Sequence, residues 1–152
     1  MTDLSVRPNA PFDLAPLARL LKTEDDLALV NPNAKFPFDP LEWREKWLNE
    51  PDDASFYVLD GNGREIGFFA LRVGIGPEVR HLVYVFVEEA ARGGAGRQLP
   101  AMAEDAARDL GALSVTLKAE TDNEAAMRLY EGAGYEELGR RRGMATMRKD
   151  VA

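Results

Sequence analysis

The sequence predicts an α/β domain of α+β type, built on one central mixed β-sheet of about six to seven strands with helices on both faces. Two observations lead to this prediction. Apolar residues alternate with period two in some segments and recur with helical spacing in others, which gives the order β-α-α-β-β-β-α-β-α-β-β. The chain has 152 residues, a usual length for one domain, so residues 1–152 are expected to form a single domain.

The first third of the chain is expected to hold one short strand and two helices. "LSVRP" has the character of a strand, and "FDLAPLARLLK" that of a helix with Asp13 as its N-cap. The apolar face of this helix consists of Leu14, Leu17 and Leu21. A turn-rich connection leads to "DPLEWREKWLNE", where Asp39 is a suitable N-cap and Glu42 closes a capping box. Trp43 and Trp47 share one face of this second helix and are expected to belong to the core.

The remaining elements follow from the change of period. "SFYVLD" and "EIGFFALRV" are expected to be strands joined by an Asn-Gly hairpin turn, and "RHLVYVFV" is apolar on both faces, as in the middle of a covered sheet. A glycine-rich loop leads to a helix from about Leu99. Its apolar stripe is Leu99, Met102, Ala103, Ala106 and Leu110. "LSVTLKA" is then a strand, "NEAAMRLYEG" a helix, and "YEELGRR" with "GMATMRK" a closing pair of strands.

Composition excludes several classes of function. With no cysteine and one histidine, His81, the chain offers no disulfide, no thiolate or multi-histidine metal site and no cysteine nucleophile, so no metal is expected. A net charge of −7 argues against nucleic acid or an anionic membrane as the partner. The start of the chain lacks signal-peptide features, and no apolar run approaches the ~20 residues of a membrane span. We therefore expect a cytoplasmic protein. The sequence leaves its oligomeric state open between a monomer and a homodimer.

The stretch "VEEAARGGAGRQLP" places glycines and arginines between a strand and a helix. Gly93, Gly94 and Gly96 give access to main-chain N–H groups, and Arg92 and Arg97 add positive charge. Such N–H groups at a helix start can hold an anion. The stretch lacks the Lys-Ser/Thr pair of a P-loop, and taken alone it does not distinguish an anion site from an ordinary glycine-rich turn.

A second motif lies in "TDNEAAMRLYEGAGY". Thr121 and Glu124 are expected to form a capping box, and Asn123, Met127 and Tyr130 fall on one face of the following helix. From spacing alone, an amphipathic helix whose tyrosine only packs is the favoured interpretation.

Together these residues resemble the GNAT superfamily of acetyl-CoA-dependent N-acetyltransferases. Asn123, Ala126, Leu129-Tyr130 and Gly134-Tyr135 match the signature N-x-x-A-x-x-L-Y-x-x-x-G-F/Y, and "V-x-x-x-x-R-G" followed by glycines resembles the pyrophosphate motif of the family. The expected order of elements is also similar over nearly the whole chain. The resemblance implies an acyltransferase that moves the acetyl group of acetyl-CoA to a primary amine, of a small molecule or a peptide, by direct attack in a ternary complex.

The resemblance also implies roles for individual residues. Tyr130 would contact the cofactor near its sulfur and act as general acid for the departing thiolate, and Asn123 would contact the cofactor as well. The main chain of Val85, Phe86 and Val87 would pair with the pantetheine arm of coenzyme A. The pyrophosphate would be held by Arg92, Gly93, Gly94, Ala95, Gly96 and Arg97.

The glycine loop departs from the family pattern. It is one residue shorter than R-G-x-G-x-G, so either Arg92 or the pair Gly94/Gly96 is in register. We expect the main-chain N–H groups from Gly94 to Gly96 to remain the donors. Pro100 removes one donor near the start of the helix, where it is expected to disturb the first turn.

The general base is the second departure. Many members carry a glutamate at the position of Val83, yet a substrate ammonium with a pKa near ~10.4 must lose a proton before it attacks. His81, two residues upstream on the same strand face, is a candidate base, with Glu78 or a chain of water molecules as alternatives. These departures motivate an alternative function, a catalytically weak GNAT-fold module that binds coenzyme A for regulation.

Overall fold

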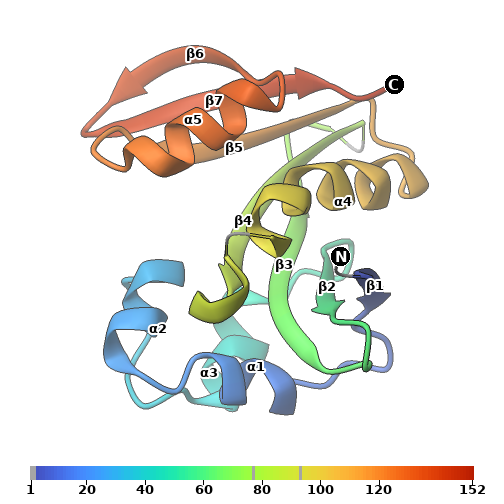
Figure 1. Cartoon of the computed structure of the whole chain (residues 1–152), viewed down its shortest axis with the longest axis vertical. Helices are drawn as coiled ribbons and strands as arrows, with labels where there is room; N and C mark the ends of the chain where they lie inside the picture. Colours follow the sequence, from blue (N-terminus) through green and yellow to red (C-terminus); the bar gives the residue numbers. More distant parts are fainter. Residues whose placement is uncertain (1–2, 77, 93) are drawn as a thin grey trace. The chain divides into compact units, whose positions relative to one another are not determined.

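The structure, a computed structural model, describes residues 3–76, 78–92 and 94–152. Among these residues the strands form a seven-stranded sheet in the order β1-β2-β3-β4-β5-β7-β6 (Figure 1). β4 and β5 run parallel, whereas β1 with β2, β5 with β7 and β6 with β7 run antiparallel. The mixed sheet predicted from the sequence is therefore confirmed.

The helices and strands have the following bounds in chain order. They are β1 (Ser5–Pro8), α1 (Ala15–Leu20), α2 (Glu24–Val30), α3 (Pro40–Glu42), a π-helical turn (Trp43–Trp47), β2 (Ala54–Leu59), β3 (Glu65–Val73), β4 (Val79–Val87), a 3-10 turn (Glu89–Ala91), α4 (Ala95–Asp109), β5 (Ser114–Glu120), α5 (Glu124–Gly132), β6 (Glu136–Arg141) and β7 (Met144–Asp150). The chain divides into two compact units, Met1–Ala70 with Tyr84–Arg92 and Leu71–Val83 with Gly93–Ala152. Each unit is described by itself.

The first unit contains a helix that the predicted order lacks. α2 begins after Thr23, whose hydroxyl accepts from the Asp26 N–H at 3.1 Å, and it buries only Leu27. The four apolar residues of α2 are consecutive, at its C-terminal end, and give no amphipathic period, which is why the pattern did not predict α2. The prediction of a capping box at the next helix, α3, is also wrong. Asp39 caps α3 as expected, but the Glu42 carboxylate accepts from the Lys35 N–H at 3.1 Å instead.

Aromatic rings form much of the core of the first unit. Trp43 is fully buried, with its ring centroid 5.3 Å from that of Phe38 and 5.2 Å from that of Tyr84. The Tyr57 hydroxyl, on β2, donates to the Asp13 carbonyl at 2.6 Å and so ties the sheet to the start of α1. Trp43 is thus a core residue, as predicted, and Trp47 is half-buried.

Gly67 of β3 marks a close approach of two strands, and replacing it by alanine is expected to lower the free energy of unfolding by about 1–3 kcal/mol. A Cβ at this position would lie 2.8 Å from the Phe86 carbonyl oxygen and 3.3 Å from the Val58 Cβ. Urea unfolding measures the effect. The matched control is Gly139→Ala on β6, where a Cβ would meet no atom of the described residues within 4 Å; equal stability of both variants would contradict the prediction.

The second unit contains the parallel strand pair and the longest helix. β4 and β5 pair over three residues, from Val79↔Ser114 to His81↔Thr116, and both α4 and α5 contact β5 (Figure 1). α4 begins at Ala95 rather than near Leu99, so the predicted start is wrong by about one turn. The first-turn N–H groups of a helix need no internal acceptor, and the glycines are therefore tolerated there.

Two further expectations concern the helices of this unit. Pro100 lies inside α4 without ending it, although the proline supplies no N–H for the Gly96 carbonyl. The prediction that Thr121 and Glu124 form a capping box at α5 is wrong. Asn123 is the N-cap, and its side-chain oxygen accepts from the Ala126 N–H at 3.0 Å, while the Thr121 hydroxyl donates to the Gly143 carbonyl at 3.2 Å.

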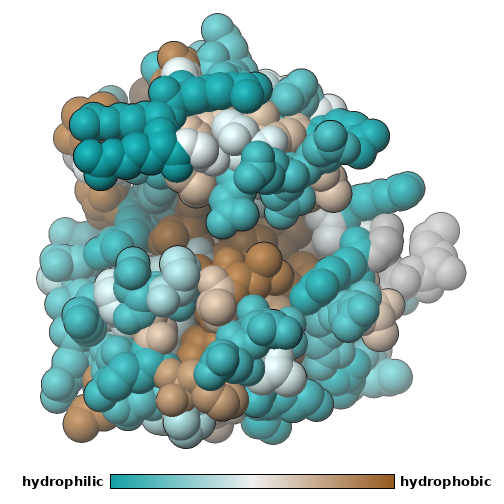
Figure 2. Space-filling view, turned by 90° about the vertical axis from the view of Figure 1, so that its left-hand side faces the viewer, coloured by the Kyte–Doolittle hydropathy of each residue, from teal (hydrophilic) through white to brown (hydrophobic). Residues whose placement is uncertain are grey.

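The surface agrees with the charged composition. Most of the face shown in Figure 2 is hydrophilic, as expected for a chain in which 30% of the residues are charged. Across the described ranges, no helix is both long enough and apolar enough to cross a membrane.

Candidate functional site

In the first unit, the main-chain groups at the end of β4 point to alternate edges of the strand. The Phe86 carbonyl faces Gly67 of β3, and the Glu88 N–H donates to a β3 carbonyl at 2.9 Å. Since main-chain groups alternate along a strand, those of Val85 and Val87 point toward the opposite edge. The main-chain groups of Val85 and the N–H of Val87 are thus available to pair with an extended ligand, whereas the Val87 carbonyl accepts from Arg92.

Arg92 braces the turn that follows β4. Its Nε donates to the Val87 carbonyl at 2.9 Å, its guanidinium lies 5.6 Å from the centroid of the Phe86 ring, and its Nη2 lies 3.7 Å from Asp26. These contacts leave the side chain partly exposed, with 43% of its surface accessible. Arg92 therefore has a local structural partner, in addition to the charge for which the sequence singled it out.

In the second unit, the start of α4 is a helix terminus without a cap. Gly94 is the N-cap residue, no side chain accepts from the first turn, and that turn contains no acidic residue. The first-turn N–H groups belong to Ala95, Gly96 and Arg97. A helix terminus with unpaired N–H groups carries partial positive charge, and the exposed Arg97 adds a full one. The start of α4 can therefore hold an anion, whereas Gly93 lies outside the described residues.

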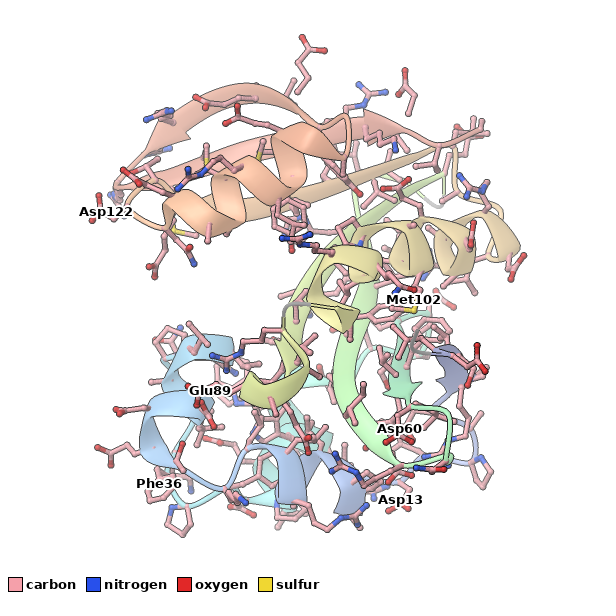
Figure 3. The ribbon with its side chains drawn as sticks, in the orientation of Figure 1. Asp13, Phe36, Asp60, Glu89, Met102 and Asp122 are labelled. Atoms are coloured by element: carbon pink, nitrogen blue, oxygen red, sulfur yellow. The ribbon has the colours of Figure 1, made fainter. Side chains whose placement is uncertain are left out.

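The start of α5 is capped by Asn123, which the sequence singled out as a ligand residue. Only the side-chain oxygen is used by the cap. The side-chain NH₂ has no hydrogen-bond acceptor within the described part of the chain, and the residue is exposed. Asn123 can thus cap α5 and still donate to a ligand. Figure 3 labels Asp122, the neighbouring residue, in the turn that precedes α5.

Tyr130 lies on the buried face of α5. The residue is only 8% exposed, and its ring is perpendicular to that of Tyr135, with centroids 5.6 Å apart. Burial raises the pKa of the Tyr130 hydroxyl to about 12, because the phenolate would lose its hydration. No described residue forms a hydrogen bond with this hydroxyl. Tyr130 therefore stays protonated well above neutral pH, in the form that a proton donor needs.

His81 lies on β4 at the end of the stretch that pairs with β5, opposite Thr116. Its Nδ1 is 2.9 Å from the Thr116 hydroxyl, and burial, together with the charges of Lys118 and Arg72, lowers the pKa of the imidazole. The ring is therefore neutral at pH 7. A proton on Nδ1 that is donated to Thr116 leaves the lone pair on Nε2, the form required of a base. Of the alternatives, the Glu78 side chain is exposed, and its carbonyl accepts from the Leu113 N–H at 2.7 Å.

Sequence reasoning missed a buried polar cluster in the second unit. Glu104 of α4 is 5% exposed and forms an ion pair with Lys149 of β7 at 2.7 Å. It lies beside the apolar stripe that contains Met102, which Figure 3 labels on α4. A glutamate next to an apolar stripe is usually solvated, so only the register of β7 could have revealed this pair. Within the described ranges, no three His, Cys, Asp or Glu side chains are placed to hold a metal ion.

Comparison with known families defines the class of this protein. Residues 20–135 match the acetyltransferase (GNAT) family, and the chain belongs to this family. The family consists of acyltransferases that use acetyl-CoA as donor. The resemblance found in the sequence is therefore confirmed.

Individual relatives agree with this assignment. An uncharacterized N-acetyltransferase of Methanocaldococcus jannaschii is 30% identical over 115 residues, 72% of this chain and 51% of the relative, so the chain spans about half the length of the curated relative it matches. Among solved structures, spermidine N-acetyltransferase from Vibrio cholerae in complex with CoA and spermine has a TM-score of 0.72 at 20% identity, covering 95% of this chain and 92% of that one.

A second solved structure, a domain from Methanocaldococcus jannaschii, has a TM-score of 0.75 at 14% identity and covers 99% of both chains. At these identities the likeness to solved structures shows the fold alone.

Proposed function

We propose that residues 1–152 act as a single N-acetyltransferase domain that transfers the acetyl group of acetyl-CoA to a primary amine. The observation that carries this proposal is the start of α4, where a family that binds coenzyme A presents uncapped N–H groups, no acidic residue and Arg97. Such a terminus suits the pyrophosphate of the cofactor. The transfer takes place by direct attack of the amine while both substrates are bound.

The residues that would hold the cofactor have distinct tasks. The main-chain groups of Val85 and the N–H of Val87 pair with the amide-containing pantetheine arm. Phe86 lies between them with its carbonyl facing β3, so the role that the sequence assigned to its main chain is not kept in this proposal. The pyrophosphate is bound by the N–H groups of the first turn of α4 and by Arg97. Asn123 donates its free NH₂. Further contacts are assigned to Arg92, Gly93, Gly94, Ala95, Gly96 and Tyr130.

Two side chains of the second unit act as general base and general acid. His81 accepts a proton from the substrate ammonium, whose nitrogen then forms a bond to the acetyl carbon. The bond from that carbon to sulfur breaks, and Tyr130 donates its proton to the departing sulfur. The acetylated nitrogen then loses its second proton, which restores the Tyr130 phenol, so the net proton released is the one that His81 accepted. The neutral His81 and the protonated Tyr130 fit these tasks, because burial disfavours the charged form of each side chain.

His81 gives this proposal a pH signature. A base works only when it is neutral, and the pKa of His81 is lowered from 6.5, so kcat/KM should fall with decreasing pH only below pH 6.5. His81→Ala should lower kcat/KM by roughly a hundredfold at pH 7 and abolish this acid limb. A pH–rate profile of both proteins measures this. If the variant keeps the rise of activity with pH, then His81 is not the base.

Binding of coenzyme A is the first experiment. A thermal shift titration should raise the melting temperature with coenzyme A concentration, because a ligand that binds only the folded state stabilises it. An assay of free thiol with a panel of primary amines follows. Binding with no turnover on any amine would favour the alternative, a regulatory module that binds coenzyme A. No shift at all would contradict both functions.

A further inference from the structure

Glu104 is a buried carboxylate with only one of its oxygens paired. Oε1 accepts from Lys149 Nζ at 2.7 Å, whereas Oε2 is equally buried and has no hydrogen-bond partner in the described part of the chain. Leaving a buried charged oxygen without a donor costs free energy. An ion pair needed only for stability would be expected to satisfy both oxygens. This arrangement points to a second task for Glu104.

The Tyr135 hydroxyl is a second buried polar group that lacks a hydrogen-bond partner. Tyr135 is 4% exposed, and its Oη has no hydrogen bond to any described residue. After burial itself, the Glu104 carboxylate raises the pKa of Tyr135 further, both by its charge and as a hydrogen-bond partner, so the hydroxyl and the carboxylate lie close together without a well-formed hydrogen bond between them. Phenylalanine would fill this space without leaving a hydroxyl unpaired. The hydroxyl is therefore not explained by packing.

Tyr135 contacts Tyr130 in two ways. Its N–H donates to the Tyr130 carbonyl at 2.9 Å, and its ring stands at 75° to the Tyr130 ring. The positive φ of Gly134, 99°, supplies the bend that returns the chain to α5. The two rings are therefore in edge contact, and the main chain beside them is held by a hydrogen bond.

We propose that Glu104, Lys149 and Tyr135 form a positioning cluster that fixes the ring of Tyr130 for proton donation. Lys149 holds one oxygen of Glu104, and a hydrogen bond from the Tyr135 hydroxyl to the other oxygen satisfies both unpaired atoms and sets the angle of the Tyr135 ring. That ring then restricts the Tyr130 ring through their edge contact. This inference rests on the proposed function, in which Tyr130 is the general acid.

Two conservative variants test the cluster by kinetics. Glu104→Gln keeps an oxygen for Lys149, and Tyr135→Phe keeps the ring. Each should lower kcat by roughly five- to tenfold with an unchanged KM for acetyl-CoA, while the melting temperature does not fall. In a Tyr130→Phe background both variants should have no further effect, because they act through the Tyr130 hydroxyl. Asp105→Asn, an exposed carboxylate on the same helix, is the control.

An NMR measurement tests the same cluster without turnover. The chain has four tyrosines, so ring-labelled protein gives few signals, and Tyr130→Phe identifies those of Tyr130. Glu104→Gln should shift or broaden the Tyr130 signals, and Asp105→Asn should not. Tyr130 signals and kcat that are unchanged in both variants would overturn the cluster, even if the wild type acetylates amines. A wild type that acetylates no amine would instead refute the proposed function, and the NMR result would still decide on the cluster.

Discussion

Reversing the charge of Arg97 is expected to weaken the binding of coenzyme A by roughly a hundredfold without loss of stability. Arg97→Glu removes a charge-assisted contact to phosphate and adds repulsion at the start of α4. A glutamate in the first turn of a helix interacts favourably with the helix dipole, by about 0.3–1 kcal/mol. Calorimetric titration with coenzyme A gives the affinity, and thermal unfolding of the free protein gives the stability.

The control for Arg97→Glu is an equal change of charge elsewhere. Lys22 is exposed and has no ion pair among the residues that the structure describes, so Lys22→Glu alters the net charge by the same amount. It should leave the affinity nearly unchanged. If both reversals weaken binding equally, only the overall charge matters, and the start of α4 is not the pyrophosphate site.

Removing the hydroxyl of Tyr130 is expected to lower kcat by about a hundredfold or more, with little change in the affinity for coenzyme A. Tyr130→Phe keeps the ring contact with Tyr135 and deletes a group that forms no hydrogen bond with any described residue. Stability should therefore be preserved. Steady-state kinetics with a fixed amine separates kcat from KM, and equal kcat in both proteins would exclude Tyr130 as the acid.

The pH dependence of the wild type provides a further check on Tyr130. A general acid loses activity as pH rises through its pKa, and the pKa of Tyr130 is raised from 10.0 to about 12. The rate should therefore not halve at pH 10, as it would for a tyrosine with the ordinary pKa. The raised pKa keeps the donor protonated, at the cost of lower acidity. A decline centred near pH 10 that is absent in Tyr130→Phe would contradict the burial argument.

The sequence predicted the strands better than the helix boundaries. Strand signals such as "EIGFFALRV" are strong because they combine apolar β-formers with a defined hairpin turn, and Asp60 and Gly63 close that turn as expected. Helix α2 was not predicted from the sequence, because Leu27 is the one residue that it buries. The start of α4 was predicted about one turn too late, because glycines are poor helix formers in the interior of a helix. The N–H groups of the first turn need no partner within the helix, so glycine is tolerated there.

Only those parts of the candidate site whose residues are close together in the sequence could be predicted. The glycine loop and the motif from Asn123 to Tyr130 are local in sequence, and a resemblance to one family identified both. Contacts that depend on strand register, such as His81 with Thr116 or Glu104 with Lys149, could not be predicted, since pairing between distant segments is not encoded in any local pattern. The same limit applies to the local partner of Arg92.

The most direct test of the central claim is mass spectrometry of a panel of primary amines after incubation with the pure protein and acetyl-CoA. The panel should include polyamines, amino acids and peptides, because the roles proposed for the start of α4, His81 and Tyr130 concern the transfer chemistry and not the acceptor. The proposed function predicts an acetylated amine and free coenzyme A in equal amounts, with the rate strongly reduced in Tyr130→Phe. Coenzyme A binding without any acetylated product, over the whole panel, would contradict the claim that this chain is an N-acetyltransferase.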